Sequence, residues 1–154
     1  MTRFAKDSRL IIDLGMNNGD DTAFYLSRGY SVVALDANPA LCAKAQVRFR
    51  AAIDDGRLKI LNAAIWEKDG HASFYVNLDN DHWSSLDVGW AGRDSTKYKE
   101  IVVQCVTLGS LSLSGIGPLQ YTARSVLISQ PQTGGLMTEY GLAGTPVRTV
   151  GRLR

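Results

Sequence analysis

The segment DLGMNNG, from Asp13 to Gly19, follows an apolar run and has the pattern D-x-G-x-N-x-G. Gly15 lets the backbone turn sharply after a strand, and Gly19 lets it approach a ligand closely because glycine has no Cβ. Asn17 can donate and accept hydrogen bonds to polar ligand groups. A carboxylate at Asp13 disfavours a phosphate and suits a cationic amino group, such as that of the methionine part of S-adenosylmethionine. The same residues also fit a plain turn between a strand and a helix.

Polar or small residues also stand at the ends of the next two apolar runs. Asp36 lies about 20 residues past the glycine segment, where a carboxylate can accept both hydrogen bonds of a ribose diol. Asn62, Ala63 and Ala64 end the following run, where an amide and small side chains can border an adenine ring. Each position has a simpler interpretation, a helix cap for Asp36 and strand-end packing for Asn62. One bound nucleoside, however, would contact all three strand ends together.

The elements that must position these residues alternate along the chain. The runs 9–15, 30–37 and 57–65 are short, apolar and rich in β-branched residues, which predicts three buried strands. With a helix in each interval, the order β-α-β-α-β predicts a parallel sheet with right-handed crossovers. The predicted fold class is therefore α/β, a Rossmann-like doubly wound sheet.

Two helices are predicted between these strands. The first begins at Asp20 or Asp21, which can cap it, and ends at Gly29. The second spans 38–56, with an asparagine as N-cap, Pro39 at its first position and a glycine at its end.

The second half of the chain has weaker signals. Asp69-Gly70 stands between two strand-like runs and predicts a β-hairpin insertion. A polar surface loop is expected over 77–99 and a strand over 100–108, and 124–129 can form another strand. The rest of the tail is rich in Gly, Pro and Thr, without a clear period. We therefore expect a cofactor-binding domain over residues 1–111 and an atypical, poorly ordered tail over 112–154.

The loop over 77–99 contains further candidates. His82 can act as a general base towards an acceptor hydroxyl, or it is a surface histidine; no firm catalytic residue is predicted. His71 is expected to face solvent from a strand. Asp79 and Asp81 can bind a hard cation, but loop carboxylates are commonly solvated, and we predict no metal site.

The three tryptophans divide in the same way. Trp83 and Trp90 lie in the predicted loop and are candidates for stacking on an acceptor or an adenine ring, whereas Trp66 falls in a strand pattern and is expected in the core. Cys42 and Cys105 are far apart and form no C-x-x-C motif, so two reduced, buried thiols are expected.

Composition limits the classes of function. The chain has 154 residues and a net charge of +2, from 17 basic and 15 acidic residues, which indicates neither a nucleic acid nor a membrane surface as partner. No apolar run reaches the roughly 18 residues of a membrane helix, and the N-terminus has no apolar signal core. We therefore expect a cytoplasmic protein with a small-molecule partner.

Several segments together resemble the FkbM-type S-adenosylmethionine-dependent methyltransferases over residues 9–111. They are, in order, IIDLGMNNGDDT, VVALDANP, LNAAIWEKDGHASFY, WSSL and VVQCVTLGSL. The resemblance implies a Rossmann-like methyltransferase fold, S-adenosylmethionine as cofactor, and O-methylation of a sugar or another small hydroxyl-bearing metabolite. It places Asp36 at the ribose and Asn62 and Ala63 at the adenine. It assigns Asp13, Gly15, Asn17 and Gly19 to the cofactor loop. It places Ser84 and Ser85 near the cofactor or the acceptor.

The chain departs from this family after residue 111. The segment TLGSL has Gly109 where the family has Asp, and no Lys-Ile-Asp-x-Glu-Gly pattern follows. Residues 101–154 also contain a single acidic residue, Glu139. We hypothesise a change of reading frame near Gly117 or Pro118, or a truncated gene, so that the fold is incomplete on its C-terminal side.

Two alternatives remain open at this point. One is a non-catalytic relic that keeps the cofactor-loop sequence without the second half of the fold. The other is an NAD-dependent oxidoreductase, which also places an acid after its second strand. The absence of a G-x-G-x-x-G spacing counts against the oxidoreductase.

Overall fold

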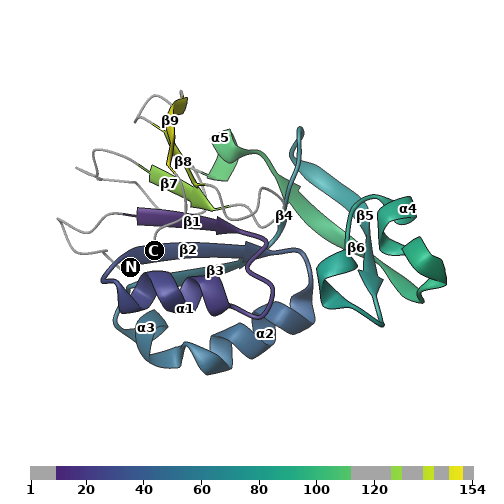
Figure 1. Cartoon of the computed structure of the whole chain (residues 1–154), viewed down its shortest axis with the longest axis horizontal. Coiled ribbons are helices and arrows are strands. Elements are labelled where there is room, and N and C mark those ends of the chain that lie inside the picture. The colour runs from purple at the N-terminus through teal and green to yellow at the C-terminus, as the bar shows by residue number, and fades with distance from the viewer. Residues whose placement is uncertain (1–9, 112–125, 130–136, 141–145, 151–154) are drawn as a thin grey trace.

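A computed structural model of the chain describes residues 10–111, 126–129, 137–140 and 146–150 and contains two β-sheets (Figure 1). The six strands of the larger sheet are β1 (Leu10–Leu14), β2 (Ser31–Asp36), β3 (Leu58–Asn62), β7 (Val126–Ser129), β8 (Met137–Tyr140) and β9 (Pro146–Val150). The smaller sheet contains β4 (Ala64–Ile65), β5 (Gly70–Asn77) and β6 (Tyr98–Val106). Their spatial orders are β3-β2-β1-β7-β8-β9 and β4-β6-β5.

The four strands β3, β2, β1 and β7 are parallel neighbours. The chain moves outward from β1 to β3 on one side and returns as β7 on the other side of β1. The strand order therefore reverses beside β1, which is the point where open α/β sheets bind ligands. The predicted α/β, Rossmann-like fold with a parallel sheet is confirmed.

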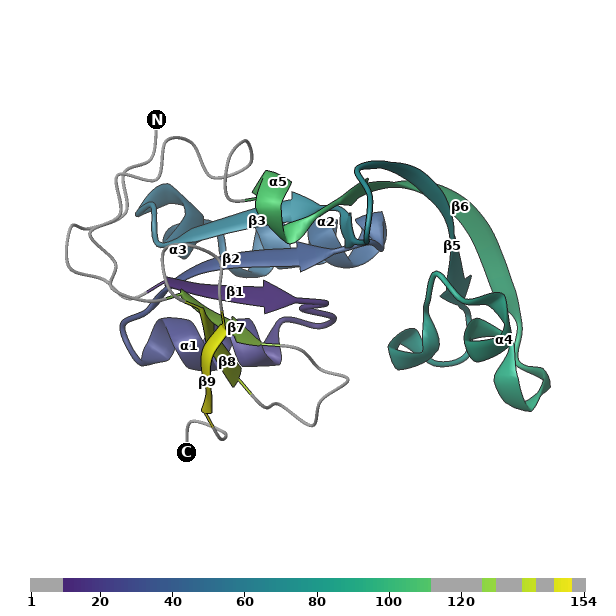
Figure 2. The same ribbon diagram turned by 90° about the horizontal axis from the view of Figure 1, so that it is seen from above.

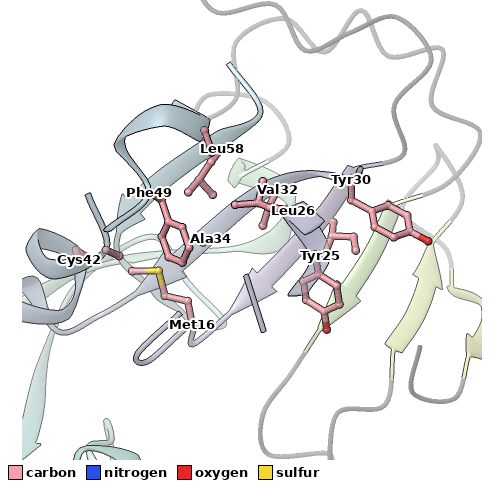
Figure 3. Close-up of a cluster of buried hydrophobic side chains, with 12 residues drawn as sticks. Met16, Tyr25, Leu26, Tyr30, Val32, Ala34, Cys42, Phe49 and Leu58 are labelled. Atoms are coloured by element: carbon pink, nitrogen blue, oxygen red, sulfur yellow. The ribbon is translucent and has the colours of Figure 1, made fainter. Parts of the chain in front are cut away.

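Three helices lie on one face of this sheet, α1 (Asp20–Ser27), α2 (Pro39–Arg48) and α3 (Arg50–Asp54) (Figure 1). Successive strand residues point to opposite faces. Ile11 thus packs with the helices, while Ile12 packs on the other face with Leu111. Figure 3 shows the cluster on the helical face, where side chains of the helices and strands meet, among them Met16, Tyr25, Leu26, Val32, Ala34, Cys42, Phe49 and Leu58.

The start of α1 differs from the prediction. Its N-cap is Gly19, in a left-handed conformation, and neither Asp20 nor Asp21 caps it. The side chain of Asn18 takes this role by accepting a hydrogen bond from the Asp20 N–H at 3.1 Å. The Asp20 carboxylate instead pairs with Arg48 at 3.0 Å. The predicted aspartate cap is therefore wrong, because Asp20 is already the first helical residue and the N-cap position belongs to Gly19.

The second helix follows its predicted start but is divided. Asn38 caps α2 through its side-chain oxygen, and Pro39 is the first helical residue, as predicted. At Phe49 the backbone leaves the helical region (φ −107°, ψ 22°), and α3 follows. Gly56 then turns the chain with φ 72°. The single predicted helix over 38–56 is thus two helices with a break at an aromatic core residue.

The predicted hairpin at Asp69-Gly70 is wrong. β4 and β5 do not pair with each other, because β6 lies between them, parallel to β4 and antiparallel to β5. The Asp69 carboxylate accepts a hydrogen bond from the Thr107 N–H at 2.7 Å and another from the Ser110 hydroxyl. The connection between β4 and β5 is therefore held by residues that follow β6. The strand that pairs with β5 is β6, from later in the sequence.

β5 and β6 extend away from the larger sheet, as Figure 2 shows. The connection between them contains the short helices η1 (Asp81–Trp83), α4 (Val88–Ala91) and η2 (Arg93–Ser95). We call residues 70–106 the lobe. The predicted surface loop over 77–99 thus contains short helical turns, and the predicted strand over 100–108 is β6, followed by α5 (Leu108–Ser110).

Three strands continue the larger sheet on the side of β1 where we expected it to be incomplete. β7 falls inside the predicted strand over 124–129, whereas β8 and β9 were not predicted. β1 is consequently an interior strand, with β2 and β7 on its two sides. Residues 1–9, 112–125, 130–136, 141–145 and 151–154 lie outside the described residues, and so does most of the predicted poorly ordered tail. The domain division at residue 111 and the change of reading frame stay predictions.

Candidate functional site

A cavity of about 860 Å³ lies between the carboxyl ends of β1 and β2 and the lobe. Its position at the reversal of strand order is the expected place for a ligand in this fold. The predicted site residues that line it are Gly15, Asn17, Asp36, Ala63, His82, Ser84 and Ser85. Three other predicted site residues, Asp13, Gly19 and Asn62, are not among its lining residues.

The loop after β1 is shaped by three left-handed residues, Gly15 (φ 74°), Asn17 (φ 51°) and, at the N-cap of α1, Gly19 (φ 85°). The N–H groups of Gly15 and Met16 both donate to the carbonyl oxygen of Leu35, at 2.8 and 3.0 Å. Asparagine is among the few residues with a side chain that adopt this conformation readily. The loop is therefore held against the end of β2 before any ligand binds.

Asp36 connects the two halves of this wall. One carboxylate oxygen accepts a hydrogen bond from the Asn17 N–H at 2.9 Å, and the other accepts one from the Asn38 N–H at 2.8 Å. Burial raises the pKa of this carboxyl group, and the two backbone N–H groups partly oppose that shift. The side chain is held in one orientation while it lines the cavity.

Asp13 has a different environment from the one we expected. Its side chain is 1% exposed, and one carboxylate oxygen accepts the hydroxyl of Thr22 at 2.7 Å. Burial raises the pKa of Asp13 to about 6, although the bond from Thr22 lowers it. Asp13 thus fastens α1 to β1 behind the loop and does not line the cavity.

Gly19 and Asn62 also serve the framework. A Cβ on Gly19 would lie 2.6 Å from Cε2 of Phe49, so the close approach at this glycine is to a core ring. The amide of Asn62 donates to the carbonyl oxygens of Asp36 and Ala37, at 2.9 and 3.1 Å. Both residues hold the strand ends that carry the cavity wall.

The lobe forms the opposite wall, and Asn77 organises it. This side chain is 1% exposed. Its amide donates to the Ala91 carbonyl oxygen and to Thr96 Oγ1, both at 2.6 Å, and its oxygen accepts the N–H groups of Asp79 and Asn80. Its own N–H donates to the hydroxyl of Ser84 at 3.0 Å. One buried amide thus fixes both ends of the 78–96 connection.

Ser84 and Ser85 are held by β5. The backbone of Ser85 exchanges hydrogen bonds with Tyr75, at 2.8 and 3.0 Å. The hydroxyl of Ser85 accepts the Asp87 N–H at 3.0 Å. These contacts hold the two serines, and both line the cavity.

The remaining loop candidates separate clearly. His82 is exposed and lines the cavity, and His71 is exposed on β5 as predicted. Asp79 does not line the cavity; its carboxylate accepts the Lys97 N–H at 2.9 Å. Within the described ranges, no three His, Cys, Asp or Glu side chains group as metal ligands.

All three tryptophans of the chain line the cavity. Trp66 is 46% exposed, so the prediction that it is a core residue is wrong: β4 ends at Ile65, immediately before it. Trp83 and Trp90 both contact Arg93, whose guanidinium carbon lies 4.7 and 3.1 Å from their ring centroids. The faces of these two rings, which we expected to stack on a ligand, are thus partly covered by the guanidinium of Arg93.

Both cysteines are free and buried, as predicted. The thiol of Cys42 donates to the Asp36 carbonyl oxygen at 3.3 Å, and burial raises its pKa to about 11. Such a thiol is a packing group under the cavity wall and not a nucleophile.

Two important residues were missed from the sequence. Asn77 stands at the end of a strand pattern, and only its position before a polar loop distinguishes it from other asparagines. Arg93 lies in a stretch that contains two tryptophans, Trp83 and Trp90, which is a signal that we did not use.

Comparisons with known proteins add little to this picture. No family model matches the chain, and no curated protein matches it. A solved structure, the 1,6-didemethyltoxoflavin-N1-methyltransferase of Burkholderia thailandensis with bound 1,6-didemethyltoxoflavin and S-adenosylhomocysteine, aligns with 84% of this chain and 68% of its own, at 16% identity and a TM-score of 0.28. This likeness is too weak to assign a function or a ligand to the chain. Among the described residues, no helix has the length and hydropathy to cross a bilayer.

Proposed function

We propose that the cavity binds S-adenosylmethionine and that the chain is a methyltransferase of the FkbM type, acting in the cytoplasm on a hydroxyl of a sugar or another small metabolite. The observation that carries this proposal is the position of Asp36. A fixed carboxylate lines the cavity at the end of β2, beside a loop with three left-handed residues.

Asp36 suits the diol of a ribose. A carboxylate oxygen can accept about two hydrogen bonds, and each oxygen of Asp36 receives one from the backbone. One acceptor position therefore remains on each oxygen for the two neighbouring hydroxyls. Because the backbone bonds fix the side chain in advance, little side-chain entropy is lost on binding.

The charges of the site favour a cationic ligand over a pyrophosphate. Asp36, Asp81 and Asp87 line the cavity, and these carboxylates attract a sulfonium and an amino group. The first turn of α1 carries two aspartates, where a dinucleotide would place its phosphates. Asp13 does not line the cavity, so these carboxylates and not Asp13 provide its negative charge. An NAD-dependent oxidoreductase is disfavoured on the same grounds.

The transfer asks little of the protein chemically. When bound, S-adenosylmethionine supplies a methyl group already activated by a positive sulfur, so the chain has to hold an acceptor oxygen in line. His82 lines the cavity with an exposed imidazole and is the candidate to take the hydroxyl proton. Ser84 and Ser85, on the same wall, support the positioning of the acceptor.

Calorimetric titration of the full chain with S-adenosylmethionine and with NAD tests the proposal. We expect S-adenosylmethionine to bind, and Asp36→Asn and Asp36→Ala to weaken binding by about 1–3 kcal/mol, the magnitude of lost hydrogen bonds to a charged group. Asp54→Asn is the matched control, because this aspartate is exposed on α3 and pairs with Arg50. Micromolar binding of NAD alone, or unchanged affinity in a folded Asp36 variant, would overturn the assignment.

Measuring catalytic turnover distinguishes an active methyltransferase from a non-catalytic relic. Methyl transfer from S-adenosylmethionine to a hydroxyl acceptor is followed as formation of S-adenosylhomocysteine. We expect this product to form, and its rate of formation to fall in His82→Ala. Binding of S-adenosylmethionine with no product from any hydroxyl acceptor would favour a non-catalytic relic.

A further inference from the structure

The wall of the cavity opposite Asp36 carries a cation. Among the described residues that line the cavity, Arg93 is the only Lys or Arg. Its guanidinium contacts the rings of Trp83 and Trp90, both of which also line the cavity. Two aromatic contacts restrict the guanidinium and remove part of its hydration, which strengthens its interaction with an anion.

The buried donor of this guanidinium is not used by the described part of the protein. The Nε atom is buried and has no hydrogen-bond partner there. Among the described residues, the ion pairs are formed by Arg48, Arg50 and Arg57. No carboxylate oxygen of the described residues lies within 4.0 Å of a side-chain nitrogen of Arg93. A buried N–H without an acceptor is destabilising, so the contacts within the described residues do not satisfy the Arg93 side chain.

The neighbouring acids do not fill this role. Asp87, on the same wall, uses one carboxylate oxygen to accept the Trp90 N–H at 2.9 Å and cap α4. Asp81 is exposed at the start of η1. Arg93 lines the cavity, and a planar guanidinium held beside two aromatic rings is a usual means of recognising a carboxylate or a phosphate.

We propose that Arg93 binds an anionic group, a carboxylate or a phosphate, on the acceptor, so that the substrate is a hydroxyl-bearing anion and not a neutral sugar. This inference rests on the proposed function for the identity of the reaction. The ribose of the cofactor would lie at the Asp36 wall and the anionic group of the acceptor at Arg93 on the opposite wall, so the two molecules bind to different parts of the cavity.

Intrinsic fluorescence tests the proposal directly, because all three tryptophans line the cavity. The full chain is titrated with glucuronate, with glucose 6-phosphate and with neutral glucose, at constant ionic strength. We expect saturable changes in emission with at least one of the two anions, at tenfold or more lower concentration than with glucose. The anion that binds identifies the carboxylate or the phosphate as the preferred group.

Three variants complete the experiment. Arg93→Gln should weaken anion binding at least tenfold, and Arg93→Lys should give an intermediate value because it keeps the charge without the planar pair of donors. Arg28→Gln is the matched control: Arg28 also lies over an aromatic ring, 5.2 Å from the centroid of Phe24, but does not line the cavity. Anion binding that is unchanged in Arg93→Gln, or no preference for either anion in the unmodified chain, would overturn the proposal.

The same samples are titrated with S-adenosylmethionine by calorimetry. Retained cofactor binding with no anion preference would refute this inference alone. Anion binding that depends on Arg93 without cofactor binding would refute the proposed function and leave an anion site. If Arg93→Gln does not fold, the titration of the unmodified chain and of Arg93→Lys still decides.

Discussion

The backbone N–H of Asn17 donates to the carboxylate of Asp36 at 2.9 Å, and this bond joins the loop after β1 to the end of β2. The donor belongs to a residue with φ 51°, so the bond depends on a left-handed backbone at an asparagine. The two motifs that the sequence places 19 residues apart are in this way a single unit of the cavity wall.

Substitutions at Asn17 should separate backbone from side chain. Asn17→Gly keeps the N–H and adopts a left-handed conformation easily, so we expect little change in stability and in cofactor affinity. Asn17→Val should lower the free energy of unfolding by about 1–2 kcal/mol, the cost of a left-handed residue with a Cβ, and weaken cofactor binding. Urea unfolding and calorimetry measure both. Equal affinity in the two variants would show that the N–H of Asn17 does not position Asp36.

Gly19 should be intolerant of any side chain because of Phe49. Gly19→Ala combines a positive φ of 85° with a Cβ that would lie 2.6 Å from the Phe49 ring. Gly29→Ala is the matched control, since Gly29 has φ 81° and a Cβ added there would have nothing within 4 Å. We expect Gly29→Ala to cost about 1 kcal/mol of unfolding free energy and Gly19→Ala clearly more. Equal losses in thermal unfolding would show that the ring moves aside at no cost.

The comparison of Gly19 with Asp36 shows what sequence could predict. Strand ends, the parallel order and Asp36 follow from local patterns, apolar runs that end in polar residues, and these were found. The reason for Gly19 was not, because the ring that contacts it comes from Phe49, 30 residues later. A sequence pattern shows that a position is glycine, but it does not show which neighbouring residue leaves no room for a side chain there.

The lobe was less accessible for the same reason. The pairing of β5 with β6 joins Gly70 to Cys105, and a tight-turn signal at Asp69 carries no information about so distant a partner. The wall formed by Arg93 likewise depends on two rings brought together by short helical turns. Local reasoning thus named His82, Trp83 and Trp90 as candidates on the opposite wall but missed the contacts that build it.

Asp13 should make stability depend on pH. Its pKa is about 6 in the folded protein and about 3.8 when unfolded, so between these values the folded state binds more protons. The contribution of Asp13 to stability is therefore highest below about pH 4, falls as the pH rises to about 6, and stays lower above, by about 3 kcal/mol. In Asp13→Asn this fall should be smaller in unfolding free energies measured between pH 4 and 8, and the part that remains is assigned to Asp36, whose pKa is also raised by burial. A profile that keeps the whole fall in the variant would show that Asp13 does not cause it.

Asn77 should control the order of the lobe without touching the Asp36 wall. Asn77→Asp keeps the oxygen that accepts the N–H groups of Asp79 and Asn80 but loses the two donors to Ala91 and Thr96. It also buries a charge at a site that is 1% exposed, so a loss of about 2–3 kcal/mol is expected. Hydrogen exchange followed by mass spectrometry should show faster exchange over 78–97 and unchanged exchange over the strands β1 and β2.

Asn80→Ala is the control for this prediction, since it removes a side chain from the same connection that caps only η1. Its effect on exchange should be confined to η1. Because Trp83, Trp90 and Arg93 all lie within 78–97, loosening this segment should abolish anion binding while S-adenosylmethionine still binds at Asp36. Faster exchange across β1 and β2 in Asn77→Asp would instead mean that the lobe and the larger sheet unfold as one unit, and the two walls of the cavity could not be varied independently.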